Sequence, residues 1–409
     1  MQHAMRIEAT GGKTLAHVSP TLEGSSSPTI LDEYMSECRQ LILEELDRRM
    51  PRSSRCRPVL YDLMLDYPLR EAKALRPTLC IATARALGGS LEAVVPTACV
   101  LELYHNAFLI HDDVEDDSDR RRGGATLHRR FGVPVAMNVG DAMLAVALGP
   151  LLDNLRLVGL GKALRILYTV SRMARQSAEG QALELAWCRE RRWELSELDY
   201  FRMVRKKTSQ YTFVAPVEMG AVLGGAEPDV LPLLRRFAGA LGAAFQIQDD
   251  VLSLTARKPE YGKDALGDLW EGKHTLIVLH MLGKATPKER ALAMAALARH
   301  RPASLGQGEA RARRLLLRLE SEHGITGAAR REIEGALFPR AASERTQADV
   351  DLLLSLITKH GSIEYARDVA ARYAQRATRS LHSLSGHLRA SVHRDVLAAL
   401  SIFVVERQH

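Results

Sequence analysis

The chain has 409 residues, of which 46% are hydrophobic and 26% are charged. These proportions are typical of a soluble globular protein, and no apolar run approaches the roughly 18 residues that cross a bilayer, so we expect no membrane span. The chain has 56 lysines and arginines against 49 aspartates and glutamates, which gives a formal net charge of +7. No recognised nucleic-acid-binding motif accompanies this charge, so we expect no nucleic-acid partner.

The N-terminal segment, residues 1–29, is rich in glycine, serine, threonine and proline and carries no signal-peptide pattern. We predict a flexible tail there. The five cysteines are widely scattered, with no C-x-x-C pair, so we expect them to be reduced. Both features predict a cytoplasmic protein.

From residue 30 onward, apolar residues recur at spacings of three and four, as at Leu148, Leu151 and Leu152, which is the period of an amphipathic helix. Strand-like alternation bounded by turn residues does not occur in the sequence. We therefore predict an all-α fold, with residues 30–409 in a single helical domain. Turn residues divide the helical blocks at 51–58, 88–89, 123–124, 132–134, 159–161, 224–228, 258–262 and 302–308.

The first candidate binding motif is Lys73-Ala74-Leu75-Arg76-Pro77. It places two cations three residues apart at a predicted helix start, because proline fits the first turn of a helix. Helix N-termini favour anions, so the motif predicts a phosphate site, with two cations on a solvated helix as the alternative. Further along, His105 lies seven residues before Asp112, so both side chains can share one helix face.

An acidic cluster, His111-Asp112-Asp113-Val114-Glu115-Asp116-Asp117, lies in an apolar helical stretch. A helix stacks Asp112 and Asp116 one turn apart, where their repulsion requires a cation. Magnesium is the simplest candidate, because one or two carboxylates hold it together with water and phosphate oxygens of a substrate. A solvated acidic face is the alternative. The run Arg120-Arg121-Arg122-Gly123-Gly124 favours the metal, since its arginines can bind a diphosphate through bidentate hydrogen bonds.

A second set of charged residues follows downstream. Arg205-Lys206-Lys207-Thr208 offers cations beside a hydroxyl, and Gln248-Asp249-Asp250 is a second acidic motif in an apolar stretch. Lys263, Asp268 and Lys273 continue the alternation of charge. Metal ions and basic side chains together would neutralise a diphosphate, which neither does alone in a sheltered pocket.

The motifs K-x-x-R-P, H, D-D-x-x-D, R-R-G, K-T, F-Q-x-x-D-D, G-K and D-x-x-E-G-K stand in an order and spacing that resembles the trans-isoprenyl diphosphate synthase (polyprenyl synthetase) family, in particular its short-chain, geranylgeranyl diphosphate synthase-like members. The resemblance is strong over residues 60–275 and weak over residues 357–407. It does not extend to residues 1–30 or to an atypical segment, residues 285–345.

The resemblance implies an isoprenoid synthase-type bundle of antiparallel helices around a deep apolar cavity, assembled as a homodimer. It implies a transferase that condenses isopentenyl diphosphate with an allylic diphosphate. Three magnesium ions per active site would be held by Asp112, Asp113, Asp116 and Asp249, with Asp250 in support. The allylic diphosphate would be bound by Arg121, Lys207 and Lys273, completed by Thr208, Gln246 and Lys263. Isopentenyl diphosphate would be bound by Lys73, Arg76, His105 and Arg122.

Two positions depart from the family pattern. Ser253 stands where the second acidic motif usually has a third aspartate, so we expect weaker magnesium binding without loss of activity. Glu71-Ala72 replaces the glycine pair that commonly precedes Lys73, so the backbone around isopentenyl diphosphate is expected to differ.

Product length should depend on the cavity depth below the first acidic motif. Counting back from Asp112, Phe108 is one helical turn away on the same face and Ala107 is five residues away. A ring narrows the cavity and an alanine leaves room, which predicts a geranylgeranyl (C20) product with C15 and C25 as neighbours. The alternative is that Phe108 is an ordinary core residue.

Three other classes remain open. A class I terpene cyclase shares the helical fold, the acidic motifs and magnesium, but ionises one substrate and needs no second diphosphate site. A prenyltransferase with a non-isoprenoid acceptor would not need the whole second basic set. A regulatory subunit of a heteromeric synthase typically loses members of the acidic or basic motifs, whereas only Ser253 departs here.

Overall fold

The computed structural model describes residues 27–70, 72–255, 266–301, 307–337 and 344–406. The predicted tail therefore lies almost entirely outside the described residues. The described chain is helical nearly throughout, which confirms the all-α prediction. Its first half contains α1 (Ser27–Arg49), η1 (Arg57–Tyr61), α2 (Asp62–Leu69), α3 (Leu75–Ala86), α4 (Leu91–Glu115), β1 (Arg120–Arg121), β2 (Gly124–Ala125), α5 (Leu127–Phe131), α6 (Val133–Val146), α7 (Leu148–Glu190), α8 (Glu197–Val204), η2 (Arg205–Val214), α9 (Ala215–Gly224) and α10 (Val230–Thr255).

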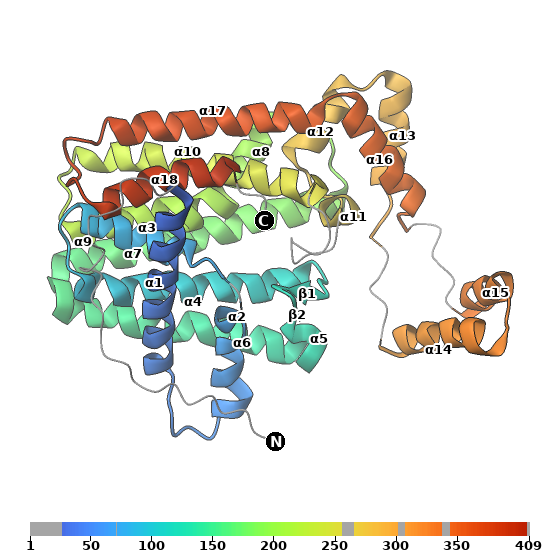
Figure 1. Ribbon diagram of the computed structural model, residues 1–409, viewed down its shortest axis with the longest axis horizontal. Coiled ribbons are helices and arrows are strands. Elements are labelled where there is room, and N and C mark those ends of the chain that lie inside the picture. The colour runs from blue at the N-terminus through green and yellow to red at the C-terminus, as the bar shows by residue number, and fades with distance from the viewer. Residues whose placement is uncertain (1–26, 71, 256–265, 302–306, 338–343, 407–409) are drawn as a thin grey trace.

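The second half continues the bundle and adds a projecting hairpin (Figure 1). Its elements are α11 (Gly267–Glu271), α12 (Leu276–Lys284), α13 (Pro287–Leu297), α14 (Gln307–His323), α15 (Gly327–Leu337), α16 (Gln347–Lys359), α17 (Ser362–His382) and α18 (Val392–Glu406).

Side chains at the helix starts fix several boundaries. Ser90 begins α4 by accepting a hydrogen bond from the backbone N–H of Ala93, and Thr275 begins α12 in the same way. A capping box between Thr286 and Glu289 begins α13. These bonds satisfy N–H groups that have no partner within the helix. The predicted break at residues 159–161 is only a kink, since α7 continues past Gly159, which has φ 77°.

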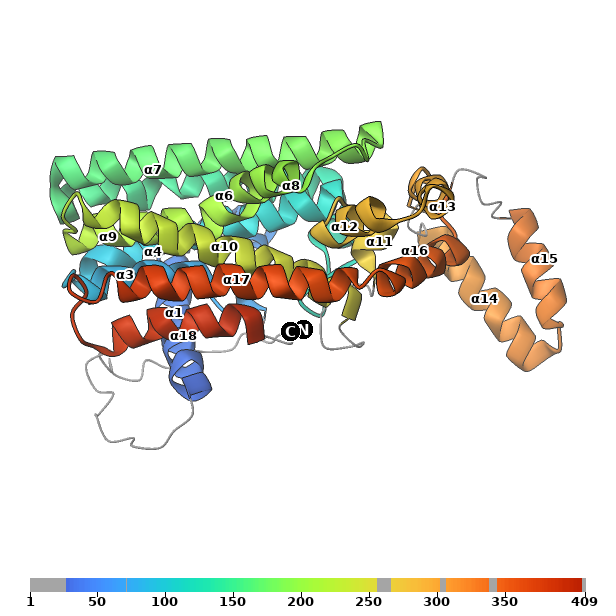
Figure 2. The same cartoon turned by 90° about the horizontal axis from the view of Figure 1, so that it is seen from above.

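The long helices lie side by side with their apolar faces together, as Figures 1 and 2 both show for α10 and α17. One buried core joins α1, α3, α4, α6, α7, α9, α10 and α18, and includes the fully buried rings of Phe213 and Phe237. A second core, around Trp187, Trp193 and Tyr200, joins α8 and α10 to α12, α13 and α16. The candidate site residues of α4 and α10 project from helices whose other faces are held in these cores.

Three stretches of the described chain are long and apolar enough to cross a membrane: α4, residues 133–190 (α6 with α7), and α10. The expectation that no stretch approaches this length is therefore wrong, because apolar residues interrupted by a few polar ones still give a high mean hydropathy. The most apolar 18-residue window of α4 is 72% buried inside the protein, whereas the corresponding window within residues 133–190 is 39% buried. The apolar surface of α4 is used in internal packing, whereas α6 and α7 leave much of theirs exposed.

The atypical segment, residues 285–345, divides into two parts. Helix α13 packs against α16, while α14 and α15 form a hairpin that projects beyond the end of the bundle (Figures 1 and 2). The stretches of chain before and after the hairpin are joined by a β-bridge between His300 and Glu344. The segment is thus rooted in the fold next to α11, although its hairpin extends away from it.

Candidate active site

Both acidic motifs line one cavity of about 520 Å³. Carboxylates of α4 and α10 contribute to its wall, as do cations of β1, η2 and the loop after α11. Aromatic and aliphatic side chains form another part. The polar lining includes Asp112, Glu115, Arg121, Lys207, Asp249, Asp250, Asp268 and Lys273, and the apolar lining includes Phe108, Leu109, Met203 and Phe245. The cavity therefore combines charges suited to a diphosphate with surface suited to a hydrocarbon chain.

The three aspartates of the first motif face different surroundings. Asp112 lines the cavity, where its carboxylate lies 3.6 Å from Lys207 Nζ. Asp113 is fully buried on another face of α4, where it accepts hydrogen bonds from Tyr67 Oη at 2.6 Å and Arg121 Nε at 2.9 Å. Asp116 follows the last turn of α4, and its Oδ2 lies 2.9 Å from Lys273 Nζ. Asp112 and Asp116 therefore lie beside lysines, whereas the buried Asp113 binds Arg121.

The arginine run forms a tight hairpin between β1 and β2. Arg121 pairs with Gly124, and the two turn residues, Arg122 (φ 48°) and Gly123 (φ 75°), both adopt left-handed conformations. Such a turn suits glycine, whereas an arginine needs tertiary contacts to hold it. Arg122 has them, since it donates hydrogen bonds to the carbonyl oxygen of Tyr67 at 3.0 Å and to His105 Nε2 at 3.2 Å. The turn therefore directs two consecutive arginines to the cavity from different positions.

Glycines position η2, which carries Lys207 and Thr208. Gly180 of α7 lies against the backbone of Lys207, and a Cβ at Gly242 of α10 would come 2.7 Å from the Cβ of Ser209. The absence of side chains at these two glycines lets η2 lie close to both helices. Lys207 also forms an ion pair with the buried Glu184. Burial alone would lower the pKa of Lys207, but Glu184 and Asp112 raise it above its usual value, so the side chain stays cationic.

The second acidic motif presents two unlike carboxylates. Asp249 is half-buried and lines the cavity, whereas Asp250 is buried and accepts hydrogen bonds from Tyr200 Oη at 2.7 Å and Gln246 Nε2 at 2.8 Å. Burial and the neighbouring Asp268 raise the pKa of Asp250 well above its usual value, against the effect of those hydrogen bonds. Gln246 in turn accepts a hydrogen bond from Thr208 at 2.6 Å. Thr208 and Gln246 thus connect η2 to the second motif.

Lys273 joins the two sides of the cavity. Its ammonium lies 2.9 Å from Asp116 Oδ2 and 2.9 Å from Glu271 Oε2. Burial opposes its charge, yet Asp116, Glu271 and Glu184 raise the pKa of Lys273 well above its usual value. A cation therefore stands between the first acidic motif and the end of α11.

The second basic set is partly assembled. Arg76, His105 and Arg122 all line the cavity, and Arg76 donates hydrogen bonds to Tyr211 Oη at 2.9 Å and Thr212 Oγ1 at 2.8 Å. Burial and the two arginines hold the pKa of His105 well below its usual value, so the ring is neutral. Its buried Nδ1 has no hydrogen-bond partner among the described residues. A neutral imidazole that accepts from Arg122 at Nε2 carries its proton at Nδ1.

Other predicted residues lie elsewhere. Lys73 is exposed, with its Nζ 4.9 Å from the ring centre of Phe403, and it does not line the cavity. Lys263 falls outside the described residues. Phe108 lines the cavity, whereas Ala107 is fully buried in the core and does not line it. Of the two residues predicted to set product length, the structure thus brings only Phe108 to the cavity.

The residues present fit a magnesium site of the kind that shares its ions with a substrate. Asp112, Asp249 and Asp268 line the cavity. Among the described residues no group of three carboxylates, imidazoles or thiols converges closely enough to enclose an ion. Magnesium keeps several water or phosphate ligands and needs only one or two carboxylates, so separated aspartates facing one cavity are a suitable donor set.

Several cavity residues were missed by the sequence analysis. Gln181 donates to Glu115 Oε2 at 2.5 Å and to Asp112 Oδ1 at 3.4 Å, and Glu184, one turn further along α7, pairs with Lys207. Tyr211 lies between Arg76 and Phe108. A glutamine and a glutamate three residues apart on a partly buried helix would have indicated a polar network, but nothing local to the sequence indicates which residues they meet.

The pattern of the Polyprenyl synthetase family matches residues 58–310, more than half of the chain. The geranylgeranyl diphosphate synthase of Methanosarcina mazei is 37% identical over 212 residues, which cover 52% of this chain and 64% of that enzyme. The short chain isoprenyl diphosphate synthase of Methanocaldococcus jannaschii is 34% identical over 244 residues, which cover 59% of this chain and 72% of that enzyme. The chain thus matches slightly less than two thirds of the Methanosarcina enzyme's length.

Solved structures agree with the sequence comparison. The geranylgeranyl pyrophosphate synthetase of Pyrococcus horikoshii has a TM-score of 0.74 at 27% identity, over 93% of this chain and 100% of that one. A polyprenyl synthase of Caulobacter crescentus, crystallised with calcium and isoprenyl diphosphate, has a TM-score of 0.71 at 26% identity, over 95% and 100%. The matching segment contains both acidic motifs and the cations around them, and the fold extends the likeness to nearly the whole chain. The chain belongs to the polyprenyl synthetase family.

Proposed function

We propose that this protein is a trans-prenyltransferase that condenses isopentenyl diphosphate head to tail with an allylic diphosphate, in a magnesium-dependent reaction that gives a short-chain all-trans prenyl diphosphate. The observation that carries the proposal is the presence of two separate cationic sets on one cavity. Arg121, Lys207 and Lys273 accompany the acidic motifs, whereas Arg76 and Arg122 lie around His105. Two diphosphates need two such sets.

The first set suits the allylic substrate. Asp112, Asp116 and Asp249 would hold magnesium, which neutralises the diphosphate and stabilises the charge that develops as it departs. Lys207 and Lys273 are held cationic by neighbouring carboxylates and can bind oxygens of the same group. The allylic C–O bond then breaks with its electron pair on the leaving diphosphate, and a carbocation remains in the cavity.

The second set suits isopentenyl diphosphate. Arg76 and Arg122 supply bidentate donors, and the neutral ring of His105 accepts a hydrogen bond from Arg122. The double bond of the bound substrate attacks the carbocation, forming the new carbon–carbon bond, and a proton then passes to the released diphosphate. No protein nucleophile is needed. Phe108 and Phe245 provide an apolar wall that excludes water from the cation.

For the product we propose geranylgeranyl diphosphate (C20), with C15 and C25 as the neighbouring outcomes. Phe108 lies edge-on to Tyr211 at 5.5 Å and to Tyr104 at 5.9 Å between ring centres, so three rings are packed together, and Phe108 and Tyr211 line the cavity. A cluster of aromatic rings restricts the space for a growing chain more rigidly than one ring would. The two synthases that we compared by sequence carry geranylgeranyl and short-chain products in their names, which supports the same range.

We further propose a homodimer without a membrane span, with α6 and α7 at the interface. Helix α6 exposes Val133 and Met137, and α7 exposes a larger set of leucines: Leu148, Leu152, Leu155, Leu160, Leu164 and Leu167. Monomers rarely expose so many large apolar side chains on one pair of helices. A dimer contact would cover the stretch that by composition alone could cross a membrane. Sedimentation of the purified protein in detergent-free buffer should give twice the chain mass, and a monomer there would contradict this proposal.

The test of the function is an incubation with magnesium, isopentenyl diphosphate and dimethylallyl, geranyl or farnesyl diphosphate in turn, followed by phosphatase treatment and measurement of chain length. Elongated alcohols are expected from each accepted primer. A terpene cyclase would instead form a hydrocarbon from one allylic diphosphate and leave isopentenyl diphosphate unused.

A further inference from the structure

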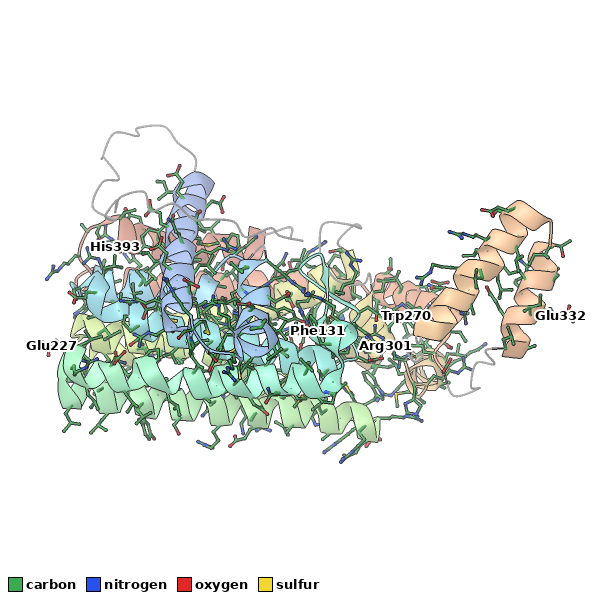
Figure 3. The ribbon with its side chains drawn as sticks, turned by 90° about the horizontal axis from the view of Figure 1, so that it is seen from below. Phe131, Glu227, Trp270, Arg301, Glu332 and His393 are labelled. Atoms are coloured by element: carbon green, nitrogen blue, oxygen red, sulfur yellow. The ribbon has the colours of Figure 1, made fainter. Side chains whose placement is uncertain are left out.

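Arg301 lies at the end of the active site that faces the projecting hairpin. It follows α13, and Figure 3 shows it beside Trp270 at the same end of the bundle, with Glu332 of the hairpin further out. Its Nη1 donates to Glu271 Oε1 at 2.7 Å and to the carbonyl oxygen of Asp116 at 3.1 Å. The other oxygen of Glu271 contacts Lys273, which in turn contacts the carboxylate of Asp116. The four residues form a closed ring of contacts, in which the link between Arg301 and Asp116 is made by a backbone carbonyl oxygen.

Within this ring Glu271 is shared by two cations. Its side chain is 16% exposed and that of Lys273 is 17% exposed, so both charges are largely removed from water. A sheltered carboxylate with one cation beside it binds that cation strongly. Because Arg301 takes one oxygen of Glu271, the attraction of that carboxylate for Lys273 is weakened. Lys273 is therefore available to an anion that enters from the cavity.

The position of Arg301 is fixed by the fold. Arg345, which is 2% exposed, donates to the carbonyl oxygens of Trp270 at 2.8 Å and of Arg299 at 2.9 Å. Its backbone N–H donates to the carbonyl oxygen of His300 at 2.6 Å. Arg345 thus joins α11 to the two residues that precede Arg301. Because these hydrogen bonds hold the backbone just before Arg301, the position from which its side chain extends is fixed.

Arg301 also lines a small cavity of about 30 Å³ together with Ser253 and Asp268. This cavity lies between the second acidic motif and Lys273, where a departing diphosphate and its metal ions would add negative and positive charge respectively. A third aspartate in place of Ser253 would compete with Glu271 for Arg301. The neutral serine leaves Arg301 to Glu271 and to the end of α4.

We propose that Arg301 is a positioning residue of this enzyme, which binds one oxygen of Glu271 and so weakens the competition of that carboxylate with the allylic diphosphate for Lys273. Through Arg301, the chain that follows α13 contributes to the active site. The proposal rests on the proposed function for the identity of the substrate, but its first test requires only a diphosphate.

The test compares full-length wild type, Arg301→Ala, Arg301→Lys and a control, Arg299→Ala. Arg299 lies two residues earlier and pairs with Asp349 at 2.7 Å, outside the cavity. Calorimetric titration with inorganic diphosphate in the presence of magnesium should show about tenfold weaker binding for Arg301→Ala, as expected when one charge-assisted contact is disturbed. Arg301→Lys should recover part of the affinity, and Arg299→Ala should match wild type.

A second change separates positioning from general damage. In Arg301→Ala, the added change Glu271→Gln removes the carboxylate that competes for Lys273, so affinity for diphosphate should rise again. In turnover assays, Arg301→Ala should raise the KM for the allylic substrate about tenfold, while the KM for isopentenyl diphosphate stays within about twofold. Equal affinities for Arg301→Ala and wild type, or no recovery on adding Glu271→Gln, would overturn the proposal. A wild type that binds diphosphate with this pattern but elongates no primer would overturn the proposed function and leave the role of Arg301 supported.

Discussion

Asp112 and Asp113 are consecutive in α4, yet their carboxylates lie in different surroundings. Asp112 lines the cavity within 3.6 Å of Lys207 Nζ, whereas Asp113 is buried against Arg121 and Tyr67. Neighbouring residues of a helix point about 100° apart, so both cannot face one cavity equally. Two aspartates of one motif therefore divide the work: one faces the ligand, and the other orients an arginine.

Substitution of each aspartate by asparagine should separate these roles. Asp113→Asn leaves the buried Arg121 with a neutral partner, so the free energy of unfolding should fall by about 3 kcal/mol, as measured by urea denaturation without metal. Asp112→Asn should change that quantity by less than about 1 kcal/mol and should instead raise the magnesium concentration for half-maximal activity. Equal losses of stability in the two variants would contradict this division.

Replacement of Phe108 by alanine should lengthen the product. The change removes a ring that packs against Tyr211 and Tyr104 at the cavity wall, so the prenyl chain can grow by at least one more five-carbon unit. Chain lengths are measured by chromatography after phosphatase treatment. Tyr104→Phe is the control, because it keeps the ring and should leave the distribution unchanged. An unchanged distribution in Phe108→Ala would mean that this side chain is ordinary core.

The serine of the second acidic motif should limit metal affinity. Ser253 lies beside Asp268, and Ser253→Asp would add a carboxylate on the same helix as Asp249. The magnesium concentration for half-maximal activity should therefore fall by about threefold or more, since a charged oxygen ligand attracts a hard cation, directly or through water. Ser253→Asn, which adds bulk without charge, serves as the control. If both variants respond alike, charge at this position does not govern metal binding.

His274 should make stability depend on pH. The ring stacks on Trp193 at 3.9 Å between centres, and burial lowers its pKa from 6.5 to about 4. The unfolded chain takes up a proton near pH 6.5 whereas the native ring stays neutral, so this contribution to stability is complete above pH 6.5 and is lost as the pH falls to 4.

The size of the effect follows from the two pKa values. Over that range the free energy of unfolding of wild type should fall by about 3 kcal/mol more than that of His274→Phe, which keeps a stacked ring but cannot titrate. Urea denaturation at several pH values measures both. Parallel pH profiles for the two proteins would show that His274 does not titrate between the folded and unfolded states in this range.

The sequence predicted the helices because their apolar periodicity is local. It did not predict that α7 would run past Gly159. One glycine with a positive φ kinks this helix, and helical structure resumes directly after it. Nor did it predict the hairpin of β1 and β2, whose strands are two residues long. Membrane-spanning potential was underestimated because unbroken apolar runs were sought, whereas mean hydropathy over a window tolerates a few polar residues.

The site was predictable to the extent that its residues occur in short motifs. Lys207 and Lys273 were found because each stands in a recognisable sequence motif. Glu184 was not, because its role depends on packing against residues far away in the chain. Glu271 stands in the motif D-x-x-E-G-K, but the motif does not reveal its contact with Arg301. The buried position of Asp113 follows from helix geometry once the neighbours of α4 are known, but the sequence does not reveal which face of α4 meets the cavity.

In the proposed reaction, one cavity binds an allylic diphosphate and isopentenyl diphosphate and joins their hydrocarbon parts. The most direct measurement follows inorganic diphosphate release and incorporation of labelled isopentenyl diphosphate in the same reaction, with magnesium and an allylic primer. One diphosphate should be released for each isopentenyl unit incorporated. When isopentenyl diphosphate is omitted, only slow hydrolysis of the primer should release diphosphate. Rapid release of diphosphate from the primer alone, with a hydrocarbon product and no label incorporated, would contradict the proposed reaction.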